Sequence, residues 1–257
     1  MVSTLWIIAW NTFTEARRDK VLGILIIFTI ILLLSSLALA ELSIGSPLKI
    51  IRDISISAIS LLCMLITIFL GTNMISKEIE KRTIYTILSK DCTRTAFLLG
   101  KFLGLITTYV ICVLGMGILF TILYVLWGGT VGLDIPIIFM GIFFELLLLN
   151  AIAIFFALVL TSPIMAAIIT FVFYVCGHAS ELMQPYVKET IHEGREFIQF
   201  MYKLIPNLRN FDYNQLFQAG LSSSEISKHI FWTSSYALVY TSIFLLASCL
   251  VFEKKNF

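Results

Sequence analysis

Hydrophobic residues dominate the chain in six long stretches that shorter polar segments separate. The six stretches cover residues 21–41, 54–75, 96–127, 135–160, 163–178 and 231–252. A helix needs roughly 20 apolar residues to cross a bilayer, and lipid offers no hydrogen-bond partner to free backbone groups. The pattern therefore predicts an all-α protein with six transmembrane helices. The third stretch is longer than one span requires, so we expect it to tilt or to continue beyond the bilayer.

Residues 3–20 precede the first stretch and have a different pattern, with apolar side chains on one helical face and charges largely elsewhere. The apolar positions are Leu5, Trp6, Ala9, Phe13 and Ala16. Tryptophans and a basic end are typical of a helix that lies in the membrane interface. We favour such an interfacial helix. The alternative is that these residues simply begin a long first span.

Residues 76–94, SKEIEKRTIYTILSKDCTR, form the densest charged run of the chain. Apolar side chains recur in this run with helical spacing, at Ile79, Thr83, Ile84, Ile87 and Leu88. Glu78 precedes Lys81 and Arg82 at the spacing at which a glutamate and a basic side chain pair on a helix. The run therefore predicts a helix with one apolar and one charged face. It is either an ordinary interfacial loop helix or a docking surface for a soluble partner.

Residues 179–230 form the longest polar segment. We expect an amphipathic helix over 184–205, ended by Pro206, and a further helix opened by a capping box from Ser222 to Glu225. Acidic and basic residues nearly balance in the segment. It is too small to be a separate enzyme domain, so we predict an outer cap of short helices.

Composition places the chain in a bilayer. It has 59% hydrophobic and 13% charged residues and a mean hydropathy of +0.96, whereas soluble domains carry about 25% charged residues. The net charge of +2 gives no reason to expect a nucleic-acid partner. With the N-terminus in the cytoplasm, 11 of the 18 Lys and Arg residues lie inside, as the positive-inside rule favours. We expect a multi-pass protein of the cell inner (cytoplasmic) membrane with both termini cytoplasmic.

The chain lacks the motifs of known catalytic and metal sites. Gly100-Lys101 resembles the end of a phosphate-binding loop, but the first glycine and the Ser or Thr after the lysine are missing. The five cysteines show neither disulfide nor zinc spacing. Cys176-Gly-His178 could belong to a soft-metal site, although packing is the simpler interpretation. We expect no catalytic residue and no metal in this chain.

Glu145 lies about ten residues into the fourth apolar stretch, near the midplane of a bilayer. A carboxylate there costs roughly 2.5 kcal/mol or more and normally faces a bundle interior or a wet cavity. It is either a residue of a substrate path, together with Asn150, or a protonated structural residue bonded to a neighbouring helix. Because Asn150 lies five positions further on, about 140° around the helix, we expect the two side chains to lie in different places.

Three segments resemble the permeases of type-2 exporter-class ABC transporters. The first is Glu78-Ile-Glu-Lys-Arg-Thr-Ile-Tyr-Thr-Ile-Leu-Ser89, followed by Arg94 and Phe97-Leu-Leu-Gly-Lys-Phe-Leu-Gly104. In that family a glutamate, K/R-T-(L/I)-x-x-(L/I)-L-S, a basic residue and GK-x-(L/I/V)-G lead into the third span. Trp10-Asn-Thr-Phe-Thr-Glu-Ala-Arg-Arg-Asp-Lys-Val-Leu22 resembles the family's N-terminal elbow, and Pro206-Asn-Leu-Arg-Asn-Phe-Asp212 resembles a motif of one bacterial branch. The likeness covers the whole chain in layout.

The resemblance implies a permease subunit whose ATP hydrolysis resides in a separate ABC ATPase, present in two copies. A second permease subunit, the same or a sibling chain, completes the membrane part, and ATP and Mg bind the ATPase. The ATPase would dock on a coupling helix whose residues are Glu78, Glu80, Lys81, Arg82, Thr83, Tyr85, Leu88, Ser89 and Arg94. The expected protein is thus one domain over 1–257, with six spans, the elbow helix, the coupling helix and the outer cap over 179–230.

Two other classes of function are alternatives to a permease. A stand-alone secondary transporter or channel would need more polar groups within the membrane, and no inverted repeat is visible. A membrane scaffold or an integral membrane enzyme is a further alternative, although the chain has no candidate catalytic cluster. An extracytoplasmic accessory protein is a further candidate partner.

Overall fold

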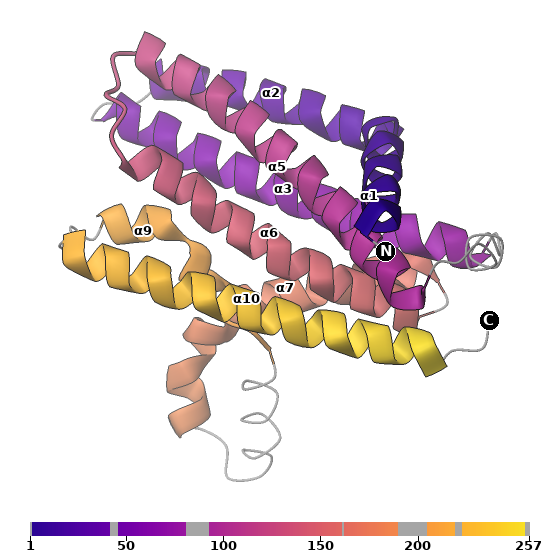
Figure 1. Cartoon of the computed structure of the whole chain (residues 1–257). Coiled ribbons are helices and arrows are strands. Elements are labelled where there is room, and N and C mark those ends of the chain that lie inside the picture. The colour runs from indigo at the N-terminus through magenta and orange to yellow at the C-terminus, as the bar shows by residue number, and fades with distance from the viewer. Residues whose placement is uncertain are drawn as a thin grey trace.

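The structure is a computed structural model of the whole chain, and it describes residues 2–41, 46–80, 93–160, 162–189, 205–218 and 223–254. Every regular element in this part of the chain is a helix (Figure 1). The elements are α1 (Val2–Arg17), α2 (Lys20–Glu41), α3 (Pro47–Glu80), α5 (Arg94–Leu126), α6 (Asp134–Val159), α7 (Pro163–Glu189), the short 3₁₀ helix η1 (Leu208–Phe211), α9 (Tyr213–Gln218) and α10 (Ser223–Lys254).

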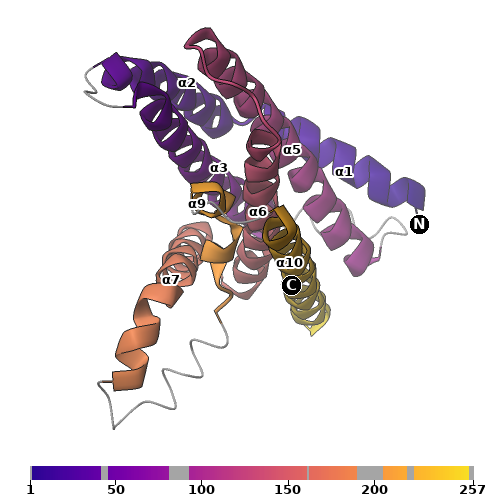
Figure 2. The same ribbon diagram turned by 90° about the vertical axis from the view of Figure 1, so that its left-hand side faces the viewer.

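Six of these helices, α2, α3, α5, α6, α7 and α10, are long and apolar enough to cross a membrane. The prediction of an all-α membrane protein with six spans is therefore confirmed. Figure 2 shows α6 in the middle of the bundle, and α6 packs against α3, α5, α7 and α10. Residues Leu148, Leu149 and Ala151 of α6 are completely buried. By contrast, α2 exposes Ile24, Ile27 and Leu34 at the periphery, as suits a surface in contact with lipid.

The chain turns sharply between α1 and α2 (Figure 1). The Asp19 carboxylate accepts a hydrogen bond from the backbone N–H of Val21 at 2.9 Å, which caps the new helix. Residues 3–20 therefore do not simply begin the first span. α1 packs against α5 instead and exposes Trp6 and Trp10.

Two helices of the predicted outer segment have different limits from those expected. The predicted start of a helix near residue 184 was wrong, because α7 continues without a break from Pro163 to Glu189. Residues 190–204 of the predicted helix lie outside the described residues. From His178 to the end of α7 the sequence contains no glycine and includes the helix formers Ala179, Glu181 and Leu182, so the helix does not end at the limit of the apolar stretch. The expected capping-box helix and the sixth span are also one helix, α10, since neither proline nor glycine separates them.

Candidate functional site: the two ends of the charged segment

Two glycines of α5 bring α1 into direct contact with that helix. A Cβ atom on Gly100 would lie 2.8 Å from the side chain of Ile8, and one on Gly104 would lie 2.5 Å from the carbonyl oxygen of Ala9. Glycines four positions apart lie on one helical face, where they let two backbones approach closely. This packing explains why the run Phe97–Gly104 carries both glycines.

Lys101 lies between these glycines and is the charge that joins three helices. Its side chain is almost completely buried, and its Nζ lies 2.7 Å from Oε1 of Glu78 on α3. The same Nζ lies 3.3 Å from Oε2 of Glu15 on α1. A buried ammonium group is tolerated when carboxylates surround it in this way. A second pair, Lys77 with Asp19 at 3.6 Å, is more exposed and adds less. We call Glu15, Glu78 and Lys101 the lysine cluster.

Arg94 holds the other end of the charged segment. Its Nη1 donates hydrogen bonds to the carbonyl oxygens of Phe252 at 2.8 Å and Glu253 at 3.1 Å, at the end of α10. The last carbonyls of a helix have no partner within it and carry partial negative charge, so a guanidinium group stabilises them. The ring of Phe97 also stacks on that of Phe252, with centroids 6.0 Å apart. Arg94 thus ties the start of α5 to the end of α10.

The predicted coupling residues divide into two groups. The structure places Glu78 and Arg94 at the ends of the segment, where both contact other helices. Glu80 ends α3. The side chain of Glu80 and residues Lys81, Arg82, Thr83, Tyr85, Leu88 and Ser89 lie outside the described residues, so their role in docking stays a prediction. The expected pairing of Glu78 with Lys81 or Arg82 falls outside the described residues too. Within them, Glu78 forms an ion pair with Lys101.

Lys101 is the residue whose role the sequence did not predict, because it was considered only as part of a phosphate-binding loop and of the run that resembles the family motif. The sequence around Lys101 nevertheless indicates that this side chain contacts another helix. A lysine within an apolar helix needs a carboxylate partner, and glycines on both sides mark the face where another helix approaches. The partner Glu15 was visible in residues 3–20, although nothing in the sequence connects the two positions.

Glu145 and Asn150 lie deep in the bundle and contact different helices. The Glu145 carboxylate lies 3.5 Å from Nε2 of His178 on α7, and the Tyr174 hydroxyl interacts with both Glu145 and Ser60. The Oδ1 atom of Asn150 accepts a hydrogen bond from the Tyr109 hydroxyl of α5 at 3.2 Å. The two side chains therefore do not form one site, in agreement with their spacing on α6.

At the opposite end of the bundle, polar contacts hold α9 in place. The guanidinium of Arg52 on α3 lies 2.7 Å from the carboxylate of Asp134 on α6. Asn214 of α9 accepts a hydrogen bond from Arg52 at 3.2 Å and donates one to Asp53 at 3.0 Å.

The segment Pro206–Asp212 lies against α6 and α7. A Cβ on Gly141 would lie 2.5 Å from the Phe211 carbonyl oxygen, and one on Gly177 would lie 2.9 Å from that of Pro206. The two glycines thus leave space for this segment, which is the run that resembles a motif of one bacterial branch of the family. In the described part of the chain, no three His, Cys, Asp or Glu side chains are placed to hold a metal ion.

Comparison with known proteins gives one result. The sequence profile of the family "ABC-2 family transporter protein" matches residues 33–257, which include the second to sixth spans. A comparison with curated proteins gave no match. The matched part contains Glu78, Arg94 and Lys101, whereas α1 with Glu15 precedes it. The chain therefore belongs to the ABC-2 transporter family and is a multi-pass membrane permease of that family.

Proposed function

We propose that the chain is the permease subunit of an ATP-driven exporter and that residues 76–94 dock a separate ATPase. The observation that supports this most strongly is that other helices hold both ends of the segment. Glu78 is bound through Lys101 to α1 and α5, and Arg94 is bound to the end of α10. A segment that served only to join two spans would not need such anchors.

The contacts of Glu78 and Arg94 would let residues 76–94 transmit movement to other helices of the bundle. A force on residues 81–92 acts directly on α3 and α5, because the segment joins those helices. Through the lysine cluster the same force reaches α1, and through Arg94 it reaches α10. Packed helices with two stable arrangements convert small displacements into larger rearrangements of the bundle. The segment would therefore act as a lever rather than as a tether.

The remaining parts of the transporter follow from this role. Two copies of an ABC ATPase bind ATP and Mg, and two permease subunits, identical or sibling chains, form the membrane part. Both termini and residues 76–94 face the cytoplasm in the inner membrane, and transport runs outward. Glu145 and Asn150 are the proposed residues of the substrate path, because they are polar side chains buried within the central helix α6.

Charge reversal in the docking segment tests the proposed function. The double variant Lys81→Glu with Arg82→Glu should lose co-purification of the ATPase and stimulation of ATP turnover in lipid, with unchanged melting of the permease. The matched control is Lys254→Glu with Lys255→Glu, a basic pair on the same proposed side, which should keep both. Unchanged ATPase binding in the first variant, or transport by the purified chain without any ATPase, would refute the assignment.

The proposed topology has its own test. Single cysteines placed next to Glu80 and next to Glu193, in a chain otherwise free of cysteine, should react with impermeant reagents from opposite sides of the membrane. Labelling of both positions from one side would contradict the arrangement of six spans with both termini inside.

A further inference from the structure

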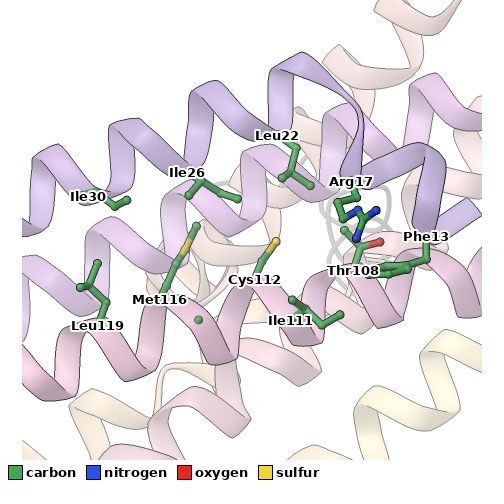
Figure 3. A pocket seen from close by; sticks show the side chains of 11 residues that line it. Phe13, Arg17, Leu22, Ile26, Ile30, Thr108, Ile111, Cys112, Met116 and Leu119 are labelled. Carbon is green, nitrogen blue, oxygen red and sulfur yellow. The ribbon is translucent and has the colours of Figure 1, made fainter.

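An apolar groove of about 240 Å³ runs between α2 and α5, next to the end of α1 (Figure 3). Leu22, Ile26 and Ile30 line it from α2, and Met116 and Leu119 face them from α5. The three α2 residues are each four positions apart and form one stripe. From Leu22 to Ile30 this stripe is about 12 Å long at a rise of ~1.5 Å per residue. The groove is therefore long, narrow and apolar.

The groove has unfilled space along its length. A Cβ atom on Gly115, which lies in the wall of the groove, would meet no atom within 4 Å. A cavity of about 150 Å³ is enough to hold a benzene ring, so this groove can hold a larger apolar group. Its shape suits a hydrocarbon chain lying parallel to the two helices.

One end of the groove is positively charged. Arg17, the last residue of α1, lines this end beside Phe13 and Thr108 (Figure 3). The nearby carboxylates are engaged elsewhere, Glu15 with Lys101 and Asp19 with Lys77. Among the ion pairs of the described residues, none includes Arg17, and its side chain is exposed. A guanidinium group at this place is available to a phosphate.

We infer that this groove binds one anionic phospholipid from the leaflet that contacts α1, with an acyl chain between α2 and α5 and the headgroup phosphate at Arg17. The site combines an open apolar channel with a basic residue at its end. A larger groove of about 610 Å³ between α5 and α6 offers the contrast, since no charged residue lines it. That groove should accept acyl chains without preference for a headgroup. The inference does not depend on the proposed docking of an ATPase.

The test is native mass spectrometry of the purified full-length chain with phosphatidylglycerol or phosphatidylcholine of identical acyl chains. The parent should retain one phosphatidylglycerol in preference to phosphatidylcholine. Arg17→Gln should lower this preference about fivefold, since a basic residue near the membrane surface contributes about 1 kcal/mol. Arg18→Gln is the matched control, because Arg18 is exposed beside Arg17 but does not line the groove. It should leave the preference unchanged.

A second pair of variants tests the channel itself. Gly115→Phe should fill the groove and abolish the preference for phosphatidylglycerol, whereas lipid held in the larger groove between α5 and α6 should stay. Gly23→Phe is its control, because a Cβ on Gly23 also meets no atom within 4 Å and Gly23 lies outside the groove. Ile26→Trp narrows the groove from the side of α2 and serves as an independent variant if Gly115→Phe melts below the parent.

Three results would overturn the inference. Equal losses in Arg17→Gln and Arg18→Gln would indicate diffuse attraction of anionic lipid rather than a site. A preference for phosphatidylglycerol that persists in both Gly115→Phe and Ile26→Trp would show that the selective site lies elsewhere. If filling the groove instead separated a dimer of this chain and left lipid binding intact, the occupant would be a second copy.

Discussion

Lys101 and Glu145 are both buried ionisable side chains in long apolar helices, and the structure surrounds them differently. Lys101 lies near the start of α5 and contacts carboxylates from two other helices. Glu145 lies in the middle of α6 and contacts a histidine and a tyrosine of α7. Opposite charge thus balances the lysine near a helix end, whereas polar groups that can be neutral surround the carboxyl in the middle. The contacts of Lys101 link α1, α3 and α5, whereas those of Glu145 mainly link α6 to α7.

The largest effect should follow from Lys101→Met, which leaves the carboxylates of Glu15 and Glu78 without their shared cation. Breaking a buried ion pair by removing one partner costs about 3 kcal/mol. We expect a clear fall in the apparent melting temperature in lipid nanodiscs. ATP turnover should also become uncoupled from transport at temperatures where the protein is still folded.

Lys77→Met is the control for Lys101→Met. The Lys77 side chain is 47% exposed and its nitrogen lies 3.6 Å from Asp19, so this change should cost under about 1 kcal/mol. Similar melting of the two variants would mean that the lysine cluster does not hold the helices together.

Changes at Glu145 should have a smaller effect on stability and separate two roles. Glu145→Gln can keep the contacts with Tyr174 and His178 and should melt like the parent. Glu145→Leu leaves those partners unsatisfied and should cost roughly 1–2 kcal/mol. The proposed role of Glu145 in the substrate path predicts that it is also needed for substrate-stimulated turnover, so that turnover falls in both variants. Parent-like transport by both would leave Glu145 a structural role only.

Tyr213 extends the comparison to a buried group that is uncharged at neutral pH. Its hydroxyl shares a hydrogen bond with Thr233 of α10, and Thr233 also donates to the His229 carbonyl. Tyr213→Phe should therefore cost about 1 kcal/mol or less, measured as a small fall in melting temperature.

The same variant predicts a difference in pH dependence. Burial raises the pKa of Tyr213, and the bond to Thr233 offsets part of this effect. Because the folded-state pKa is raised, the stabilisation is complete below the ordinary pKa of about 10 and is lost as the pH rises through the folded-state value. The decline in stability above about pH 10 should be smaller in Tyr213→Phe. An identical decline in both proteins would mean that Tyr213 does not titrate with unfolding.

Hydropathy was sufficient to locate the spans but not their places in the bundle. The mean hydropathy of the most apolar window is 2.9 in α2 and 2.6 in α6, yet α2 lies at the periphery and α6 in the centre. Lipid and the interior of a membrane protein are equally apolar, so hydrophobicity cannot tell them apart. Small and polar residues carry that information instead, such as Ala151, Ala153 and Asn150 in α6.

The candidate site was predictable only in part. The charged run of residues 76–94 and the glutamate in α6 stand out locally, because charges are rare within apolar sequence. The contacts of Lys101 and Arg94 depend on partners 86 and 158 positions away along the chain. No local pattern encodes such pairs, and they become visible only when the packing of the helices is known.

The packing of α1 against α5 has a consequence for the order in which the helices assemble during synthesis. Glu15 leaves the ribosome 86 residues before Lys101, which corresponds to roughly 4–17 s at ~5–20 residues per second. During this interval α1 has neither its lysine partner nor the two glycines against which it packs. Before α5 is available, α1 needs another surface to bind. The exposed Trp6 and Trp10 suit the membrane surface beside the translocon. In this order of assembly, α1 is synthesised first but packs against α5 only after α5, the third span, has been inserted.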